Sequence, residues 1–422
     1  MPRYLPRATL AFRHALVATC DRGASDAGLV PDAAVAVSDR LVGWVGPDAA
    51  LEASVDLAGA DVVDVAGRLV TPGLVDSHTH LVFAGDRANE LSERAAGRSY
   101  ADIARAGGGL HATVRATAAA SDPALLDAAV ARAHRLLAQG VTTVEVKSGY
   151  GLAPAAELRL LRVVAELART VWPVMTVVPT LLAHAVPRER EGNRARWVEE
   201  VCEALVPAVA AEGLALFCDA FADDGALTLA EARRVLEAGA HHRLVPRLHA
   251  DQLGPRGGAQ LAAELGCASA DHLEHVDDAG IAALAGAGVV AGLLPVASLF
   301  LGEGHAPARR LLAAGVPVAL ATNLNPGTAM SENVGLTLSL GVLALGLTPA
   351  EALVAFTAGG ARALRRPDLG RLARGCEADL VVWGCRSVDH LPWHLGVSHA
   401  RTVVKRGRIV HRGEGPLVAD CE

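Results

Sequence analysis

Two histidines separated by a single residue, His78 and His80, offer the clearest chemistry in this sequence. They follow an apolar run that contains Pro72-Gly73 and ends at Asp76, which we predict to be a buried strand. Side chains two positions apart on a strand point to the same side, so both imidazoles can reach one metal ion. The pair therefore predicts a metal site, completed by ligands from elsewhere in the chain.

The expected third nitrogen ligand is His249, which closes another strand-like run in Arg247-Leu-His249. Three imidazoles would hold zinc or ferrous iron and leave one position for water. The alternative for His249 is a core histidine bonded to the backbone. His272, at the end of the next run, is placed to act on activated water or on a substrate carbonyl as acid or base. Glu274 and His275 lie just beyond and are assigned to the surroundings, outside the site.

Strand-like apolar runs alternate with helical stretches rich in Ala, Leu, Arg and Glu, a pattern that predicts parallel strands joined by right-handed crossovers. We expect eight such units, which make a TIM (β/α)8 barrel of the α/β class. Barrel enzymes place their chemistry at the carboxyl ends of the strands. The expected strand ends lie at or near His78, Val146, Pro179, Phe221, His249, Asp271, Leu294 and Thr322.

Short β-rich runs occur at both ends of the chain, for example Ala34–Ser38 and Ala378–Trp383. We expect them to join in one small β-sandwich-like domain. The predicted division assigns residues 1–68 and 368–422 to this domain and residues 69–367 to the barrel.

Composition narrows the classes of protein. The 422 residues are 51% hydrophobic and 20% charged, which is typical of a globular protein. The formal net charge of -7 comes without a basic stripe, so nucleic acid is not an expected partner. Two uncharged runs, 280–302 and 333–350, are long enough to span a membrane, but Gly, Pro and Ser interrupt them and we expect no span.

The seven cysteines are scattered, odd in number and contain no C-x-x-C pair, which argues against a disulfide framework and a cysteine zinc site. Arg13 and His14 interrupt the first apolar stretch, so we predict no signal peptide. These features favour the cytoplasm.

Four motifs together resemble the amidohydrolase superfamily over nearly the whole chain: P-G-L-V-D before His78, H-A-D-Q from His249, S-A-D-H-L-E around His272, and N-P-G-T from Asn325. Three further segments, Phe83–Glu90, Glu145–Leu152 and Leu182–Pro187, resemble imidazolonepropionases in particular. The resemblance implies one divalent metal per chain, Zn²⁺ or Fe²⁺, and a homodimer.

The resemblance also implies roles for polar residues outside the histidine set. Residues that bind a substrate with a propanoate arm and an imidazolone ring fall on Arg87, Tyr100, Tyr150 and His184. Arginine suits a carboxylate because its planar guanidinium can donate two parallel hydrogen bonds. The ring-contacting group is Gln252, and the groups at the product-like end of the ligand are Asn325, Gly327 and Thr328. Gly107–Gly109 is similar to the glycine-rich loop of the family and is expected to cover the barrel mouth.

The sequence departs from the family at Asn323, where an aspartate is expected to bind the metal and accept a proton from water. An asparagine can offer its carbonyl oxygen to a metal but cannot serve as a general base near neutral pH. We therefore expect impaired turnover unless another group, such as His272, takes the proton.

The resulting hypothesis is hydrolysis of the cyclic amide of 4-imidazolone-5-propanoate to N-formimidoyl-L-glutamate by metal-activated water, a step of histidine degradation. One alternative is another hydrolase or deaminase of the superfamily, with two metals bridged by a carboxylated Lys147. The other is a non-catalytic barrel that binds a small acid, suggested by Asn323.

Overall fold

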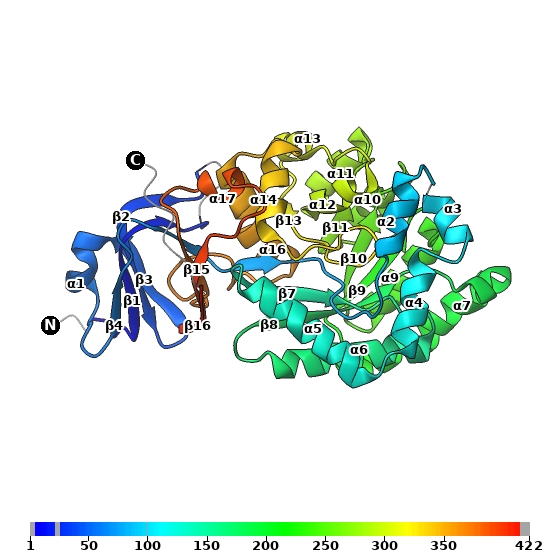
Figure 1. Cartoon of the computed structure of the whole chain (residues 1–422), viewed down its shortest axis with the longest axis horizontal. Helices are drawn as coiled ribbons and strands as arrows, with labels where there is room; N and C mark the ends of the chain where they lie inside the picture. Colours follow the sequence, from blue (N-terminus) through cyan, green and yellow to red (C-terminus); the bar gives the residue numbers. More distant parts are fainter. Residues whose placement is uncertain (1–4, 22–25, 99, 414–422) are drawn as a thin grey trace.

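The computed structural model describes residues 5–21, 26–98 and 100–413, without the side chains at positions 100, 101 and 104. It contains a helix-covered barrel and a smaller sheet beside it (Figure 1). Helices α2, α3 and α4 lie at the end of the barrel that is remote from the small sheet (Figure 1).

The barrel is an 8-stranded parallel sheet in the order β13-β12-β11-β10-β9-β8-β7-β6, so each strand pairs with its neighbour in the sequence. Its strands are β6 (Leu74–Asp76), β7 (Val141–Lys147), β8 (Thr176–Ala183), β9 (Phe217–Ala222), β10 (Val245–Ala250), β11 (Ser269–His272), β12 (Val290–Leu293) and β13 (Val318–Leu320). The helices that follow these strands are α2 (Ala88–Ala95), α3 (Tyr100–Arg105), α4 (Leu110–Ala119), α5 (Asp122–Leu137), α6 (Pro154–Thr170), α7 (Arg194–Glu200), α8 (Val206–Ala211), α9 (Leu229–His241), α10 (Gly258–Glu264), α11 (Asp278–Ala287), α12 (Pro295–Leu301), α13 (Ala308–Ala313), α14 (Val334–Leu343), α15 (Pro349–Val354) and α16 (Gly360–Ala363).

Strand β7 and helix α6 illustrate why the chain alternates in this way. Every residue of β7 is buried, as expected for a parallel strand covered on both faces, and its β-branched residues fit such a position. Helix α6 begins at Pro154, whose missing N–H costs nothing in a first turn. It buries one apolar face, including Leu160 and Val164, against the barrel.

Polar contacts join the two ends of the barrel sheet, β6 and β13. The Asp76 carboxylate accepts the Thr322 N–H at 3.1 Å and the Thr322 hydroxyl at 2.6 Å. Beyond the ends of these two strands, the His80 N–H donates to the Leu324 carbonyl at 2.9 Å. The barrel is therefore closed at the carboxyl ends of its strands, beside the histidines that the sequence assigns to the metal.

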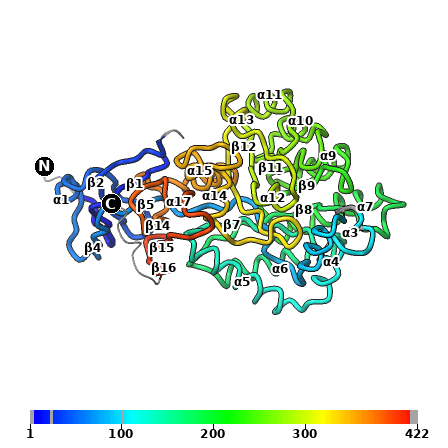
Figure 2. Tube along the Cα trace, turned by 45° about the horizontal axis from the view of Figure 1, so that its top comes forward, coloured from blue at the N-terminus to red at the C-terminus, as the bar shows by residue number. Residues whose placement is uncertain are grey.

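The smaller unit is one mixed 8-stranded sheet in the order β16-β15-β14-β5-β1-β2-β3, with β4 paired to β1. Strands from the first and last parts of the chain meet in it, since β14 pairs with β5 and β5 with β1, and these strands lie beside one another in Figure 2. Phe12, Val35, Val70, Leu380 and Val404 belong to one buried cluster, so the sheet folds around its own apolar face. Its strands are β1 (Leu10–Ala18), β2 (Leu29–Ser38), β3 (Leu41–Pro47), β4 (Asp61–Asp64), β5 (Leu69–Pro72), β14 (Leu380–Trp383), β15 (Ala400–Lys405) and β16 (Arg408–Arg412), with the short helix α1 (Leu51–Ser54). The short helix α17 (His390–Trp393) packs against α14 of the barrel.

The expected fold is confirmed: an eight-stranded barrel with a separate sheet built from the chain ends. One strand end was placed wrongly, because β8 continues past Pro179 to Ala183. Proline removes only a donor, and the Pro179 carbonyl still accepts the Leu216 N–H at 3.0 Å. Strand β5 pairs with β1 and β14, so residues 69–72 extend the small sheet. Over the described residues, no helix combines the length and the apolar character needed to cross a membrane.

The small sheet is joined to the barrel by apolar packing and by the buried side chain of Lys405, which an ion pair within the small sheet holds near β7. Val381, Trp383 and Val403 belong to the same buried cluster as Val141 of the barrel. The Lys405 ammonium lies 2.6 Å from the Asp379 carboxylate, with side chains 0% and 3% exposed, and 3.5 Å from the Thr143 hydroxyl on β7.

We expect Lys405→Met to lower the free energy of unfolding by about 3–5 kcal/mol, because it leaves the Asp379 carboxylate buried without its cation. Adding Asp379→Asn should recover most of the loss, since the amide carries no charge and still accepts the Arg406 N–H. Urea unfolding measures both variants. Arg162→Met, which breaks an exposed ion pair with Glu212, is the matched control and should change little. Equal effects at the two sites would contradict the prediction.

Candidate active site

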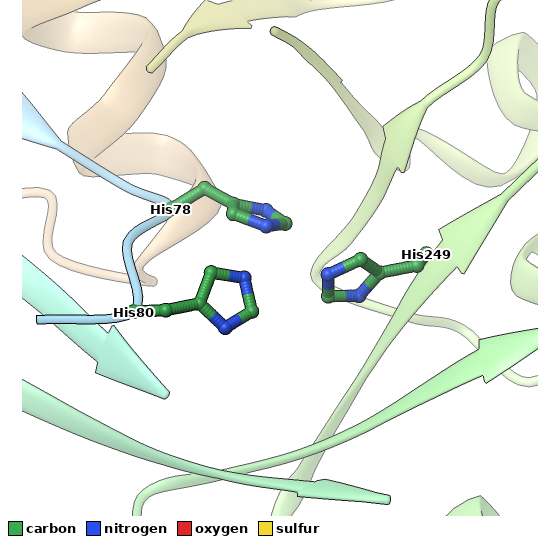
Figure 3. Close-up of side chains that lie close together, drawn as sticks. All are labelled: His78, His80 and His249. Atoms are coloured by element: carbon green, nitrogen blue, oxygen red, sulfur yellow. The ribbon is translucent and has the colours of Figure 1, made fainter. Parts of the chain in front are cut away.

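Three buried histidines converge at the barrel mouth. His78 and His80 follow β6, and His249 faces them from β10 (Figure 3). One nitrogen from each ring lies within 4.8 Å of the others. Burial lowers the pKa of His78, His80 and His249, so their rings are neutral and can act as ligands near neutral pH.

The donor atoms of this group fit a metal ion. His78 Nε2 is buried and has no hydrogen-bond partner within the described ranges. Buried polar atoms are normally bonded, so this nitrogen requires a further partner. Three imidazoles around a common point are a donor set suited to Zn²⁺ or Fe²⁺.

The second nitrogen of His78 is held by a buried carboxylate. Asp271 Oδ2 lies 2.7 Å from His78 Nδ1 and also accepts a hydrogen bond from Arg247 at 2.9 Å. Burial raises the pKa of Asp271, but the Arg247 guanidinium and nearby cations outweigh it, and the net shift is downward. Gly292 on β12 leaves space for this carboxylate, because a Cβ there would lie 2.2 Å from Asp271 Oδ1. The carboxylate therefore orients the His78 ring, as outer partners of metal ligands do.

His249 has an equivalent support. Its Nδ1 lies 3.2 Å from Asp219, which accepts a hydrogen bond from Lys147 at 2.7 Å. Lys147 also donates to Glu145 at 2.8 Å, and all three charged side chains are fully buried. Burial raises the pKa of Asp219, but Lys147 and His249 lower it by more. The net shift is downward, so the carboxylate stays ionised. Lys147 thus holds the carboxylate that orients His249.

His272 lies beside the three histidines at the end of β11. Its ring centroid is 5.4 Å from that of His249 and 5.7 Å from that of His78. His272 and Leu273 have φ values of 83° and 68°, a backbone conformation that non-glycine residues rarely adopt. Glu274 Oε1 lies 3.6 Å from His272 Nδ1 and accepts the Ser298 hydroxyl at 2.8 Å. The residue that sequence analysis assigned to the surroundings is therefore a buried neighbour of His272.

Asn323 lies at the same mouth, directly after β13. Its N–H donates to the His78 carbonyl at 3.1 Å, and its φ is 54°. The side-chain oxygen is buried, and no described residue donates a hydrogen bond to it. A neutral oxygen beside the histidines is available as an acceptor or a weak metal ligand.

Aromatic rings and a further histidine line the next part of the mouth. The Tyr150 and His184 ring centroids lie 5.8 and 5.9 Å from that of His80, and 5.8 Å from each other. His184 Nδ1 is 3.0 Å from the Gly149 carbonyl. Burial lowers the pKa of His184 to about 4, so its ring is neutral. These residues form a wall that combines flat apolar faces with polar edges.

Arg87 reaches the loop after β13. Its Nε and Nη2 donate to Glu90 Oε2 at 2.9 and 2.7 Å. A Cβ on Gly327 would lie 2.1 Å from Arg87 Nη1, so the guanidinium rests against the backbone of that loop. The other carboxylate oxygen of Glu90 accepts the Gly109 N–H at 2.7 Å. One buried acid thus joins Arg87 to the glycine-rich segment.

The remaining predicted residues differ in what their side chains do. Asn325 Oδ1 accepts the N–H groups of Gly327 and Thr328, each at 2.8 Å, so its side chain builds the turn. Gln252 is buried, and its backbone N–H donates to the Asp223 carboxylate at 2.8 Å. Tyr100 opens α3, and its side chain lies outside the described part of the structure.

Sequence reasoning missed the charged residues behind the histidines, namely Asp271, Arg247, Asp219 and Glu145. One signal was available, since a carboxylate inside an otherwise apolar strand, such as Asp219 in β9, needs a buried partner. Which partner it has depends on neighbouring strands.

The comparisons with known proteins agree with this geometry. Residues 69–410 match the model of the amidohydrolase family. Imidazolonepropionases of Anaeromyxobacter dehalogenans (strain 2CP-1), Myxococcus xanthus and Geobacillus kaustophilus are 66%, 54% and 44% identical to this chain. The alignments cover 99%, 90% and 92% of this chain and 99%, 91% and 92% of those proteins.

A crystal structure of 5-methylcytosine deaminase from Klebsiella pneumoniae matches with a TM-score of 0.75 and 17% identity, over 97% of this chain and 100% of that chain. At this identity the likeness concerns the fold alone. Full-length identity to the curated relatives carries more: the chain belongs to the amidohydrolase family and, within it, to the imidazolonepropionases.

Proposed function

We propose that this chain hydrolyses 4-imidazolone-5-propanoate to N-formimidoyl-L-glutamate. The observation that carries the proposal is the convergence of three buried, neutral histidines, which offer one nitrogen each within 4.8 Å of the others. Membership of the imidazolonepropionases supplies the substrate. In the reaction, water oxygen adds to the ring carbonyl carbon, the C–N bond breaks, and the released nitrogen gains a proton.

His78, His80 and His249 would hold one divalent cation, Zn²⁺ or Fe²⁺. Such a cation supplies Lewis acidity, which activates water and polarises a carbonyl oxygen. Asp271 and Asp219 fix the orientation of His78 and His249 from behind.

Arg87 would bind the propanoate arm. Its Nε and Nη2 are bonded to Glu90, which fixes the guanidinium, and a guanidinium is the side-chain group best suited to a substrate carboxylate. Tyr150 and His184 would contact the ring, which places it between Arg87 and the histidines. This arrangement holds the scissile bond in one orientation.

Two positions at the mouth, those of His272 and Asn323, are candidates for the group that transfers protons. His272 is placed to donate to the carbonyl oxygen as negative charge develops there, or to accept a proton from water. Asn323 can accept a hydrogen bond but cannot take a proton, so the chain carries a weaker base than an aspartate would provide. The competing proposal of a non-catalytic barrel rests on the same residue.

A second cation bridged by a carboxylated lysine is disfavoured by the surroundings of Lys147. Its ammonium lies between Glu145 and Asp219, at 2.8 and 2.7 Å, where its positive charge is matched. We therefore propose one metal per chain. We also propose a cytoplasmic location, in keeping with the free cysteines among the described residues. The homodimer stays a prediction from the family.

Asn323→Asp should raise turnover by about 10²- to 10⁴-fold, because it restores a base beside the histidines. Loss of the ring's ultraviolet absorbance with freshly generated 4-imidazolone-5-propanoate measures it. Asn193→Asp, the same change at an exposed position, is the matched control and should leave the rate unchanged. Equal activity of wild type and Asn323→Asp would mean that another group, such as His272, is the base. Silence in both would overturn the substrate assignment.

Metal content should be one ion per chain in the wild type and well below one in His249→Ala, because two imidazoles bind a divalent cation more weakly than three. Elemental analysis after dialysis gives both values, and His241→Ala, an exposed histidine at the end of α9, should retain its metal. Two ions per chain would favour the lysine-bridged alternative.

A further inference from the structure

Glu90 has no role in the chemistry described above, yet its carboxylate is among the most heavily bonded near the site. It lies in the first turn of α2, and its side chain is 8% exposed. Oε2 accepts two hydrogen bonds from Arg87, and Oε1 accepts the Gly109 N–H. We propose that Glu90 is a positioning residue that fixes Arg87 and thereby selects the length of the acidic arm that the site accepts. This inference rests on the proposed role of Arg87.

The contacts determine the orientation of the guanidinium. Two hydrogen bonds from Nε and Nη2 to one carboxylate hold the guanidinium plane, and Nη1 is pressed against Gly327 on the opposite side. The guanidinium is therefore held between α2 and the loop after β13. A guanidinium held in this way can bind a ligand carboxylate only at a fixed distance from the histidines.

The surrounding backbone is shaped around the Glu90 carboxylate. A Cβ on Gly108 would lie 2.9 Å from Glu90 Oε1 and 2.8 Å from the Ile103 side chain. Gly109 has a φ of 68° and donates its N–H to the same oxygen. The glycine-rich segment thus closes against Glu90, which ties this part of the chain to the arm-binding arginine.

Helix α2 itself is anchored at its other end. Arg94 donates to the Phe300 carbonyl at 2.5 Å, and its guanidinium lies 5.3 Å from the Phe300 ring centroid. Glu90 is therefore carried by a helix that is fixed to the region after β12. The Arg87 guanidinium is therefore held by Glu90, and the helix that carries Glu90 is held in turn by the contact between Arg94 and Phe300.

The test measures binding, so it does not depend on turnover or on Asn323. Zinc-loaded protein is titrated by calorimetry with imidazole-4-propanoate and with imidazole-4-butanoate, whose arm is one methylene longer. Each ligand carries one carboxylate, so a change in the charge at position 90 affects both affinities similarly and cancels in their ratio. We expect the wild type to prefer the propanoate by about tenfold or more.

Glu90→Asp keeps the charge but withdraws the carboxylate by one methylene, whereas Glu90→Gln keeps the length but loses one of the acceptors. Both should reduce the preference to less than about threefold, because a mobile guanidinium can meet either arm. If the amide variant does not fold, the aspartate variant carries the test. The probe 4-ethylimidazole, which lacks the carboxylate arm, should bind all folded variants alike.

Two controls separate positioning from general disturbance. Glu93→Gln, on the same helix and paired with Arg98, should retain the preference. In an Arg87→Ala background the preference should already be lost, and Glu90→Gln should lower it no further. A preference that survives both changes at position 90 would overturn the inference and leave the proposed function standing. A wild type without preference for the propanoate would overturn the substrate assignment itself.

Discussion

Two buried carboxylates, each neutralised by a buried cation, determine the geometry of the candidate active site. Asp271 with Arg247 holds His78, and Asp219 with Lys147 holds His249. Removing either cation would leave a charge in a low-dielectric interior, a loss of about 3–5 kcal/mol for pairs of this kind. The carboxylates can therefore remain ionised in the core, and an ionised carboxylate accepts a hydrogen bond from the N–H of the outer imidazole nitrogen. The inner nitrogens are then directed at a common point.

The barrel architecture makes these pairs possible. Asp219, His249 and Asp271 lie on the consecutive strands β9, β10 and β11, and the parallel register places His249 directly between Phe221 and Asp271. The supporting charges come from strands on either side, so the site is a property of the sheet, not of any single loop. The loop residues, such as Asn325 with its turn, form another part of the mouth. The histidines and their buried partners on the strands are thus distinct from the loop residues at the same end of the barrel.

Much of the arrangement was predictable from the sequence because local patterns encode it. The spacing of His78 and His80 on one strand, and the position of His249 at the end of another, follow from strand periodicity alone. The partners behind them could not be found in this way. The contact between His78 and Asp271 joins residues 193 positions apart, and Lys147 reaches Asp219 across 72. Lys147 shows the limit clearly: near a strand end it suggested a bridging ligand, and only the neighbouring strands identify it as a counter-ion. Pro179 similarly suggested a strand end, although the sheet tolerates the loss of one donor.

The contacts that orient the histidines are separate from the side chain of Asn323, which determines what the proposed function expects of this residue. The imidazoles are oriented by Asp271 and Asp219, and neither of these contacts involves the side chain of Asn323. Its backbone N–H still bonds to the His78 carbonyl, so the junction between β6 and β13 is kept whichever side chain is present. The change from acid to amide therefore acts on the electrostatics at the reacting end and leaves the scaffold of ligands in place. Under the proposed function, a chain built in this way would lose a base without losing its histidine ligands, and proton transfer would fall to the His272 side of the mouth, where the imidazole and Glu274 lie 3.6 Å apart.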